Sequence, residues 1–158
     1  MAISSAVLYS DNFAFFGLYI VKPGFRKQGY GLRLTEEVLK YVGDRITGLD
    51  AVLPQVSKYE KIGYFPSHKQ TRYEWSRHPS FSPSPHIVDL RTIPFPQLEQ
   101  FDLNYFQSPR PNFLHAWIHQ THSHALGYLT NNQFLGYGVI RKCIQGHKIG
   151  PLFATTPP

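Results

Sequence analysis

The sequence predicts a mixed fold of the α/β (α+β) class, built from two parts that a short connector joins. Apolar runs rich in β-branched and aromatic residues predict strands, and segments with the periodicity of an amphipathic helix lie between them. A stretch with three prolines and four serines interrupts this alternation near the middle of the chain. With 158 residues, 42% of them hydrophobic and 15% aromatic, the chain is able to bury a core.

The first part, residues 1–75, reads as strand, strand, helix, strand, helix, strand. Apolar runs at 3–9 and 13–21 flank Ser-Asp-Asn, which predicts a β-hairpin. Residues 29–42 place apolar side chains on one helix face, and Gly43 ends that helix. The remaining segments are expected to be a short buried strand, a short helix closed by a glycine and an extended strand, at 47–54, 55–63 and 64–75.

Proline withdraws backbone donors and disfavours helix before it, so residues 76–86 are expected to form an extended connector. The second part, residues 87–158, reads as strand, helix, helix and three strands. Pro96 suits a first helical turn, and Asn131-Asn132 between two apolar runs predicts a second hairpin. The expected elements are the strand 87–93, the helices 95–106 and 111–120, and the strands 125–130, 133–142 and 147–154.

The formal net charge of +6 favours an anionic partner such as a phosphate-bearing ligand. The basic residues are scattered rather than gathered in a dense run, so nucleic acid is not an expected partner. The single cysteine excludes a disulfide framework within the chain and suits a reducing, cytoplasmic compartment. The N-terminal segment has no basic leader region and no apolar run reaches spanning length, so no membrane partner is expected.

The stretch YIVKPGFRKQGYGLRL joins the second strand to the first helix through a glycine-bearing turn. The first N–H groups of a helix lack partners and its dipole adds partial positive charge, so this turn suits an anion. Gly29 and Gly31 would let a diphosphate approach the backbone, and Arg26 and Lys27 add flexible charge. The alternative is a turn that needs glycine only for its dihedral angles. The residues that follow fit neither a P-loop nor a dinucleotide fingerprint.

Arg26-x-x-Gly29-x-Gly31, after the strand GLYIVKPGF and before an amphipathic helix, resembles the acetyl-CoA-binding motif of the GCN5-related N-acetyltransferase (GNAT) family. Further along, SKYEKIGYF resembles the Y-E-K-x-G-F segment of that family. The resemblance covers residues 2–75 as the C-terminal half of the domain. It implies a GNAT-like mixed sheet with flanking helices, and an N-acyltransferase that moves an acetyl group from acetyl-CoA to an amine.

The same resemblance assigns roles to individual residues. Backbone groups of Tyr19, Ile20 and Val21 would pair with the pantetheine arm, and the Val21 amide would steady the oxyanion at the thioester carbonyl. The backbone amides of the glycine turn would hold the pyrophosphate. The implied acyl-CoA-binding residues are Tyr19, Ile20, Val21, Arg26, Lys27, Gln28, Gly29, Tyr30, Gly31 and Leu32.

The resemblance also implies that Tyr59 protonates the departing CoA thiolate as general acid. The alternative is a helix tyrosine at the edge of the core with its hydroxyl in water. Asp50 is the nearest carboxylate for a general base, against the alternative of a solvated aspartate. The family often has an asparagine seven residues before the tyrosine; here that position is Val52, and Gln55 lies closer to the tyrosine.

The order of elements departs from the family, because the strand, two helices and strands that open the GNAT fold are absent before the glycine turn. Residues 87–158 have that order and resemble the front half of a second domain in tandem GNAT-like proteins. The chain is therefore expected to be an incomplete domain pair, a permuted fold or a domain-swapped homodimer. Its acceptor would be a small-molecule or peptide amine. The alternative function is a non-catalytic GNAT-like remnant that acts as a CoA-binding or protein-interaction module.

Three other groups of residues are possible sites. The four histidines of HAWIHQTHSH have helical spacing, but no carboxylate or HExxH accompanies them, so solvated histidines and no metal are expected. Cys143 is expected to be a small buried strand residue rather than a reactive thiol. The run RYEW, residues 72–75, is expected to pack within a strand.

Overall fold

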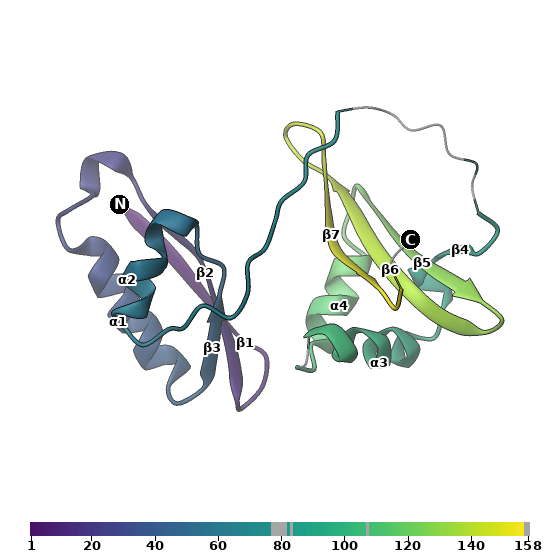
Figure 1. Cartoon of the computed structure of the whole chain (residues 1–158), viewed down its shortest axis with the longest axis horizontal. Coiled ribbons are helices and arrows are strands. Elements are labelled where there is room, and N and C mark those ends of the chain that lie inside the picture. The colour runs from purple at the N-terminus through teal and green to yellow at the C-terminus, as the bar shows by residue number, and fades with distance from the viewer. Residues whose placement is uncertain (77–81, 83, 107, 157–158) are drawn as a thin grey trace. The chain divides into compact units, whose positions relative to one another are not determined.

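The structure is a computed structural model that describes residues 1–76, 82, 84–106 and 108–156. It divides into two compact units, Met1–Pro79 and Ser80–Pro158, each with its own sheet and core (Figure 1). The predicted mixed α+β class is confirmed. The division falls inside the predicted connector, most of which lies outside the described residues. Which part of a GNAT domain each unit represents stays a prediction.

The first unit has a three-stranded mixed sheet in the order β1-β2-β3. β1 and β2 form the predicted antiparallel hairpin, and β3 runs parallel to β2. Parallel neighbours need a crossover connection, which α1 supplies. The elements are β1 (Ala2–Leu8), β2 (Phe13–Val21), α1 (Tyr30–Val42), β3 (Ile46–Leu49) and α2 (Val56–Glu60), with short 3₁₀ helices at Pro23–Phe25 and Leu53–Gln55.

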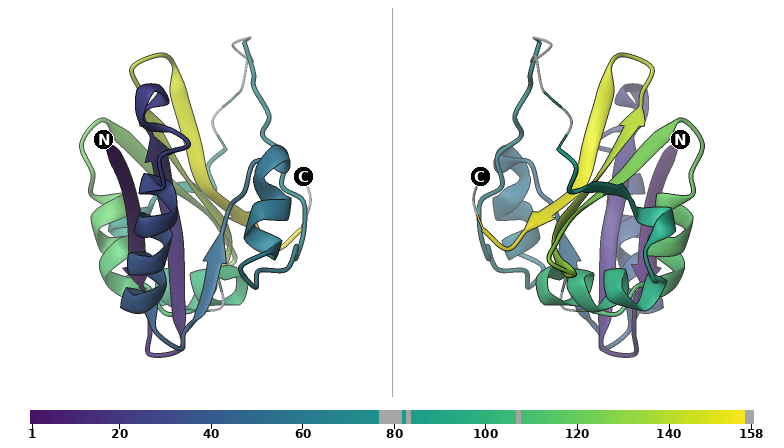
Figure 2. Two further views of the ribbon diagram at one scale, coloured as in Figure 1. Left: turned by 90° about the vertical axis from the view of Figure 1, so that its left-hand side faces the viewer. Right: turned by 90° about the vertical axis from the view of Figure 1, so that its right-hand side faces the viewer.

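Helix α1 lies along one face of this sheet (Figure 2) because its apolar residues recur on one side. Val38 and Val42 are buried against Ala14 and Phe16 of β2. Gly43 follows the helix with a φ of 61°, a conformation that favours glycine, and its N–H donates to a carbonyl of the last turn. This small core fixes the position of β2 and of the turn that leaves it.

The second unit is a four-stranded antiparallel sheet in the order β4-β5-β6-β7, with α3 and α4 on one face (Figure 2). Asn131 and Asn132 have φ values of 48° and 59°, as the two-residue turn of a type I′ hairpin requires. The elements are β4 (Ile87–Asp89), a 3₁₀ helix (Leu90–Thr92), α3 (Phe95–Phe106), α4 (Pro111–Ile118), β5 (Ser123–Thr130), β6 (Gln133–Lys142) and β7 (His147–Ala154). The buried core consists of Leu90, Leu98, Phe101, Leu114, Ile118, Ala125, Phe134, Tyr137 and Val139.

A buried ion pair ties α3 to the start of α4. The side chains of Arg110 and Asp102 are 7% and 2% exposed, and Arg110 donates from Nε and Nη2 to the carboxylate at 2.7 and 2.6 Å. The Tyr137 hydroxyl donates to the same carboxylate. Burial lowers the pKa of Arg110, but the hydrogen bonds and charge of Asp102 outweigh it and the net shift is upward. Burial and the hydrogen bond to Asp102 raise the pKa of Tyr137.

The predicted strand at 64–75 is wrong. This segment is irregular, and Phe65 and Tyr73 are 89% and 90% exposed, so the expected packing of RYEW within a strand is wrong as well. An extended segment forms a stable strand only when it pairs within a sheet and buries one face. Neither sheet of the described residues includes this segment.

Two other strands are shorter than the sequence predicts. The buried strand expected at 47–54 is the short edge strand β3, in which Ile46 is 75% exposed. The strand expected at 87–93 ends early because Asp89 accepts the Arg91 N–H and caps a 3₁₀ helix.

Cys143 follows β6 and is half-buried, so the expectation of a buried strand residue is wrong. Among the described residues, no helix has both the length and the apolar character needed to cross a membrane.

Candidate functional site

The outstanding feature of the first unit is an open edge on β2. Pairing between β2 and β3 runs from Phe13 opposite Ile46 to Phe16 opposite Leu49 and stops there. Pairing between β2 and β1 continues to Val21, opposite the start of β1. Residues 17–21 of β2 are therefore held on one side only, and their other edge has no strand partner among the described residues.

A bulge lies where this open edge begins. Leu18 has a φ of 52°, which is uncommon for a residue with a side chain, and the β1–β2 register shifts between Ile3 and Ser5. Bulges bend the strand that carries them and re-aim the residues that follow. The bend separates the β3-paired stretch of β2 from the stretch that ends at Val21.

The open edge presents the main-chain groups of alternate residues. The Lys22 N–H donates to the Met1 carbonyl at 3.1 Å and so points toward the β1 side. Successive residues of a strand direct their N–H and C=O groups to opposite edges, so those of Val21 and Tyr19 face the open edge. Ile20 directs its groups toward its β1 partner, so its predicted backbone pairing with the pantetheine arm does not fit this edge. The edge thus offers two residues with which an extended ligand can pair.

The glycine turn follows directly and places a helix N-terminus beside the end of β2. Gly29 precedes α1 with a φ of 82°, and a Cβ at this position would meet nothing within 4 Å. The Arg33 N–H is the first to bond within the helix, to the Gly29 carbonyl at 3.1 Å. The three N–H groups before it have no partner inside the helix, as at any helix start. The space in front of them is open at Gly29, which suits an anion.

The two glycines of the motif have different reasons. A Cβ on Gly31 would overlap the Tyr19 hydroxyl and lie 3.4 Å from Val21 Cγ2. Gly31 therefore lets β2 and its Tyr19 side chain approach α1 closely, rather than leaving room for a ligand. Gly29 has a positive φ, as expected if the turn needs glycine for its dihedral angles. It also has open space beside it, as expected if the turn binds a ligand.

The other predicted residues of the turn are exposed. Lys27 has a φ of 61°, and the Gln28 side-chain amide donates to the Gly24 carbonyl at 3.1 Å. Tyr30 is 41% exposed and packs edge-on against Phe25. The side chain of Arg26 donates from Nε to the Val21 carbonyl at 3.0 Å. Leu32 lies on α1 and is 60% exposed.

Tyr59 lies in an aromatic cluster beside the same stretch of β2. Its ring makes edge contacts with Phe16 and Tyr64, with centroids 6.5 and 6.0 Å apart, and Phe16 in turn contacts Tyr19 at 5.7 Å. Burial, and then the proximity of Tyr19, raise the pKa of Tyr59 above its ordinary value near 10. The structure therefore brings Tyr59 and Tyr19 together, and it keeps the Tyr59 hydroxyl protonated at neutral pH.

Tyr64 is a member of this cluster that sequence reasoning missed. Burial, and then the proximity of Tyr59, raise its pKa, and Thr47 has a smaller lowering effect on it. In the part of the chain that the structure describes, the buried Tyr64 hydroxyl has no hydrogen-bond partner. Only its place after Gly63 in the second motif singles it out in the sequence. The sequence does not predict the bulge at Leu18, because leucine rarely adopts a positive φ.

Several predicted residues are not part of this arrangement. Asp50 is exposed in the loop after β3, and Val52 is 68% exposed. His115 of α4 stacks with His119, the residue that follows this helix in the second unit, with ring centroids 4.5 Å apart. In the part of the chain that the structure describes, no group of three or more histidine, cysteine or acidic side chains is placed to hold a metal.

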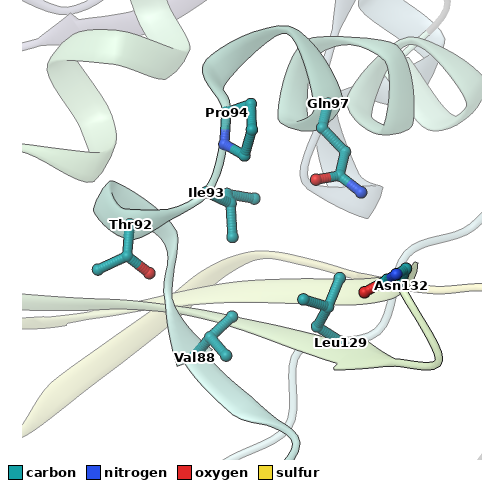
Figure 3. A pocket seen from close by; sticks show the side chains of 7 residues that line it. All are labelled: Val88, Thr92, Ile93, Pro94, Gln97, Leu129 and Asn132. Atoms are coloured by element: carbon teal, nitrogen blue, oxygen red, sulfur yellow. The ribbon is translucent and has the colours of Figure 1, made fainter.

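A hollow in the second unit, of about 390 Å³, lies between the strands β4 and β5 and the start of α3 (Figure 3). It has no titratable side chain among its lining residues, so it offers neither an acid nor a base. Its lining residues are Val88, Thr92, Ile93, Pro94, Gln97, Leu129 and Asn132.

Comparison with known proteins shows what this chain is similar to. Residues 98–158 match the family described as an acetyltransferase (GNAT) domain. Over 154 residues the chain is 27% identical to holothin acyltransferase from Pseudoalteromonas sp. (strain SANK 73390), covering 98% of this chain and 52% of that protein. A crystal structure described as a candidate acetyltransferase from Pyrococcus horikoshii superposes with a TM-score of 0.81 at 23% identity, over 98% of this chain and 52% of that one.

The chain thus spans about half the length of both proteins. The family match lies in the second unit, whereas the motifs of the glycine turn and Tyr59 lie in the first. The two longer similarities extend over both units. Residues 98–158 thus match the GNAT acetyltransferase domain, and the chain as a whole is similar to an acyltransferase.

Proposed function

We propose that the chain acts as an N-acyltransferase that moves an acetyl group from acetyl-CoA to a small-molecule or peptide amine. The observation that carries this proposal is the open edge of β2 beside the start of α1. An extended thioester arm with an anionic end needs main-chain partners along its length and N–H groups at its charged end. This unit offers both next to one another.

The geometry supports a binding role for several of these residues. Main-chain groups of Tyr19 and Val21 would pair with the pantetheine arm as an added strand. The amides from Lys27 to Leu32, with the side chains of Arg26 and Lys27, would hold the pyrophosphate. Open space at Gly29 supports this placement, because nothing lies within 4 Å of a Cβ built at this residue.

The reaction would form a C–N bond and break the C–S bond of the thioester. As the amine attacks, an N–H of the open edge, that of Val21 or Tyr19, would donate to the oxyanion. Tyr59 would give its proton to the departing thiolate; its pKa lies above the ordinary value near 10, so its hydroxyl is protonated at neutral pH as in any tyrosine. The attacking nitrogen would lose its proton to water; Asp50 is exposed and lies outside the aromatic cluster.

The assembly of the protein belongs to the proposal as well. We keep the interpretation of residues 1–75 as the C-terminal half of a GNAT domain and of 87–158 as the front half of a second one. The native particle mass, measured with its CoA stoichiometry, distinguishes a fragment from a permuted fold and from a swapped homodimer. We also propose a cytoplasmic location for this activity.

Calorimetry with acetyl-CoA and with desulfo-CoA tests the binding part of the proposal. We expect saturable binding of both, followed by release of free CoA thiol when acetyl-CoA and a panel of amines are supplied. Well-folded protein that binds neither ligand at high micromolar concentration would contradict the proposal. Binding without turnover of any amine would instead support a non-catalytic CoA-binding module.

A further inference from the structure

The open edge of β2 is partly closed by a side chain from the turn beyond it. Arg26 donates from Nε to the Val21 carbonyl at 3.0 Å. That carbonyl belongs to one of the two residues whose main-chain groups face the open edge. The backbone N–H of Arg26 donates to the Pro23 carbonyl at 3.2 Å, so the turn itself holds Arg26 in reach of β2.

An added strand and Arg26 compete for the same place. A ligand that pairs with the open edge needs the Val21 carbonyl as an acceptor, and its own donor would approach along the direction that the guanidinium now occupies. The side chain of Arg26 is exposed to solvent, so this contact can be exchanged easily. This competition should therefore weaken binding of an added strand by about the free energy of one exposed hydrogen bond.

The anionic end of CoA removes this competition. The guanidinium lies on the turn that also carries Gly29 and the free amides of α1, where a pyrophosphate would bind. Arginine pairs with phosphate through a planar fork of donors, which is stronger than its bond to a neutral carbonyl. A diphosphate at the turn would draw Arg26 from Val21 and leave the carbonyl free for the pantetheine arm.

We propose that Arg26 is a specificity-determining residue that opens the β2 edge to CoA thioesters and keeps it closed to pantetheine thioesters that lack the diphosphate. This inference rests on the proposed function, since it concerns the same site. It assigns the side chain two opposed effects. Arg26 strengthens binding of a diphosphate-bearing donor, and it weakens binding of the bare arm.

Substitution at Arg26 separates these effects. Arg26→Ala is expected to weaken binding of CoA and to strengthen binding of pantetheine by about two- to tenfold, the range for one net hydrogen bond. Arg26→Lys replaces Nε by a methylene group but keeps the positive charge. It is expected to gain pantetheine binding as Arg26→Ala does, while losing less of its affinity for CoA. Arg72→Ala removes an exposed arginine from the irregular segment and serves as the matched control.

Displacement of a fluorescent CoA derivative measures both ligands on one scale, and thermal melts check that each variant folds. The proposal is supported when the Arg26 variants change the two affinities in opposite directions and Arg72→Ala changes neither. It is overturned when pantetheine binding stays the same or falls in both Arg26 variants. A wild-type chain that does not bind CoA at all would overturn the proposed function first, and this inference with it.

Discussion

Substitutions at Gly29 are the most informative test of the site, because the backbone conformation and the space around the residue affect stability and CoA binding separately. Its φ of 82° is one that residues with a Cβ adopt at a cost of about 1–2 kcal/mol. A Cβ built at this position meets nothing within 4 Å, so no steric clash adds to that cost. Gly29→Ala and Gly29→Glu should therefore lose similar stability, about 1–2 kcal/mol each.

The two variants should differ sharply in CoA binding. The carboxylate introduced by Gly29→Glu would place a negative charge near the proposed pyrophosphate site. A charge about 5 Å from each of two phosphate charges costs roughly 1.7 kcal/mol at the dielectric constant of water, or about a 15-fold loss of affinity. A less polar environment increases this loss several-fold further. Gly29→Ala adds only a methyl group and should bind within a few-fold of wild type.

Denaturant unfolding and calorimetry with desulfo-CoA check both quantities on the same samples. Gly29→Asn supplies a control that tolerates a positive φ and carries no charge, so it should bind CoA and retain more stability than Gly29→Ala. Equal CoA affinity in Gly29→Glu and Gly29→Ala would refute the placement of the pyrophosphate at this turn. A loss of stability much above that range would refute the claim that the space around Gly29 is open.

The remaining predictions concern catalysis and the core of the second unit. Tyr59→Phe should keep CoA binding and slow turnover, measured by thiol release, by about 10²-fold at neutral pH. Because the pKa of Tyr59 is raised, the wild-type rate should fall only at a pH above the ordinary tyrosine pKa near 10. The variant should not show this fall at high pH. An unchanged rate at every pH would exclude the general-acid role. Asp102→Ala should cost about 3–5 kcal/mol in denaturant unfolding, because Arg110 is left as a buried, unpaired charge. Glu99→Gln, a half-buried residue of the same helix, is the control and should change stability by less than about 0.5 kcal/mol; equal losses in both variants would contradict the assignment.

The sequence predicts local elements of this fold well where the hydrophobic periodicity and the turn-forming or helix-ending residues agree. The bounds of β2 and β7 match the predicted runs, and α1 ends where Gly43 predicts. These successes depend on residues within one element. The strand predicted at 64–75 failed because its aromatic residues satisfy a strand propensity, whereas strand formation depends on a partner that propensity cannot supply.

The candidate site was predictable in its residues but not in its geometry. The motifs point to the glycine turn and to Tyr59, yet the open edge exists because β3 stops pairing at Leu49, which no motif encodes. The contact between Tyr19 and Gly31 joins two elements and changes the reason for that glycine. The Asp102–Arg110 pair is likewise invisible in the sequence, since both residues look like ordinary surface charges until the fold buries them.

Amide chemical shifts of the isotopically labelled chain, titrated with desulfo-CoA, test the central claim most directly. The claim is that the donor pairs with the open edge of β2 and ends at the glycine turn. We expect the largest shift changes at the amides of Tyr19, Val21 and residues 27–32, and we expect the first two amides to gain protection from hydrogen exchange. Saturable binding that leaves these amides unchanged, or that perturbs only the hollow of the second unit, would contradict it.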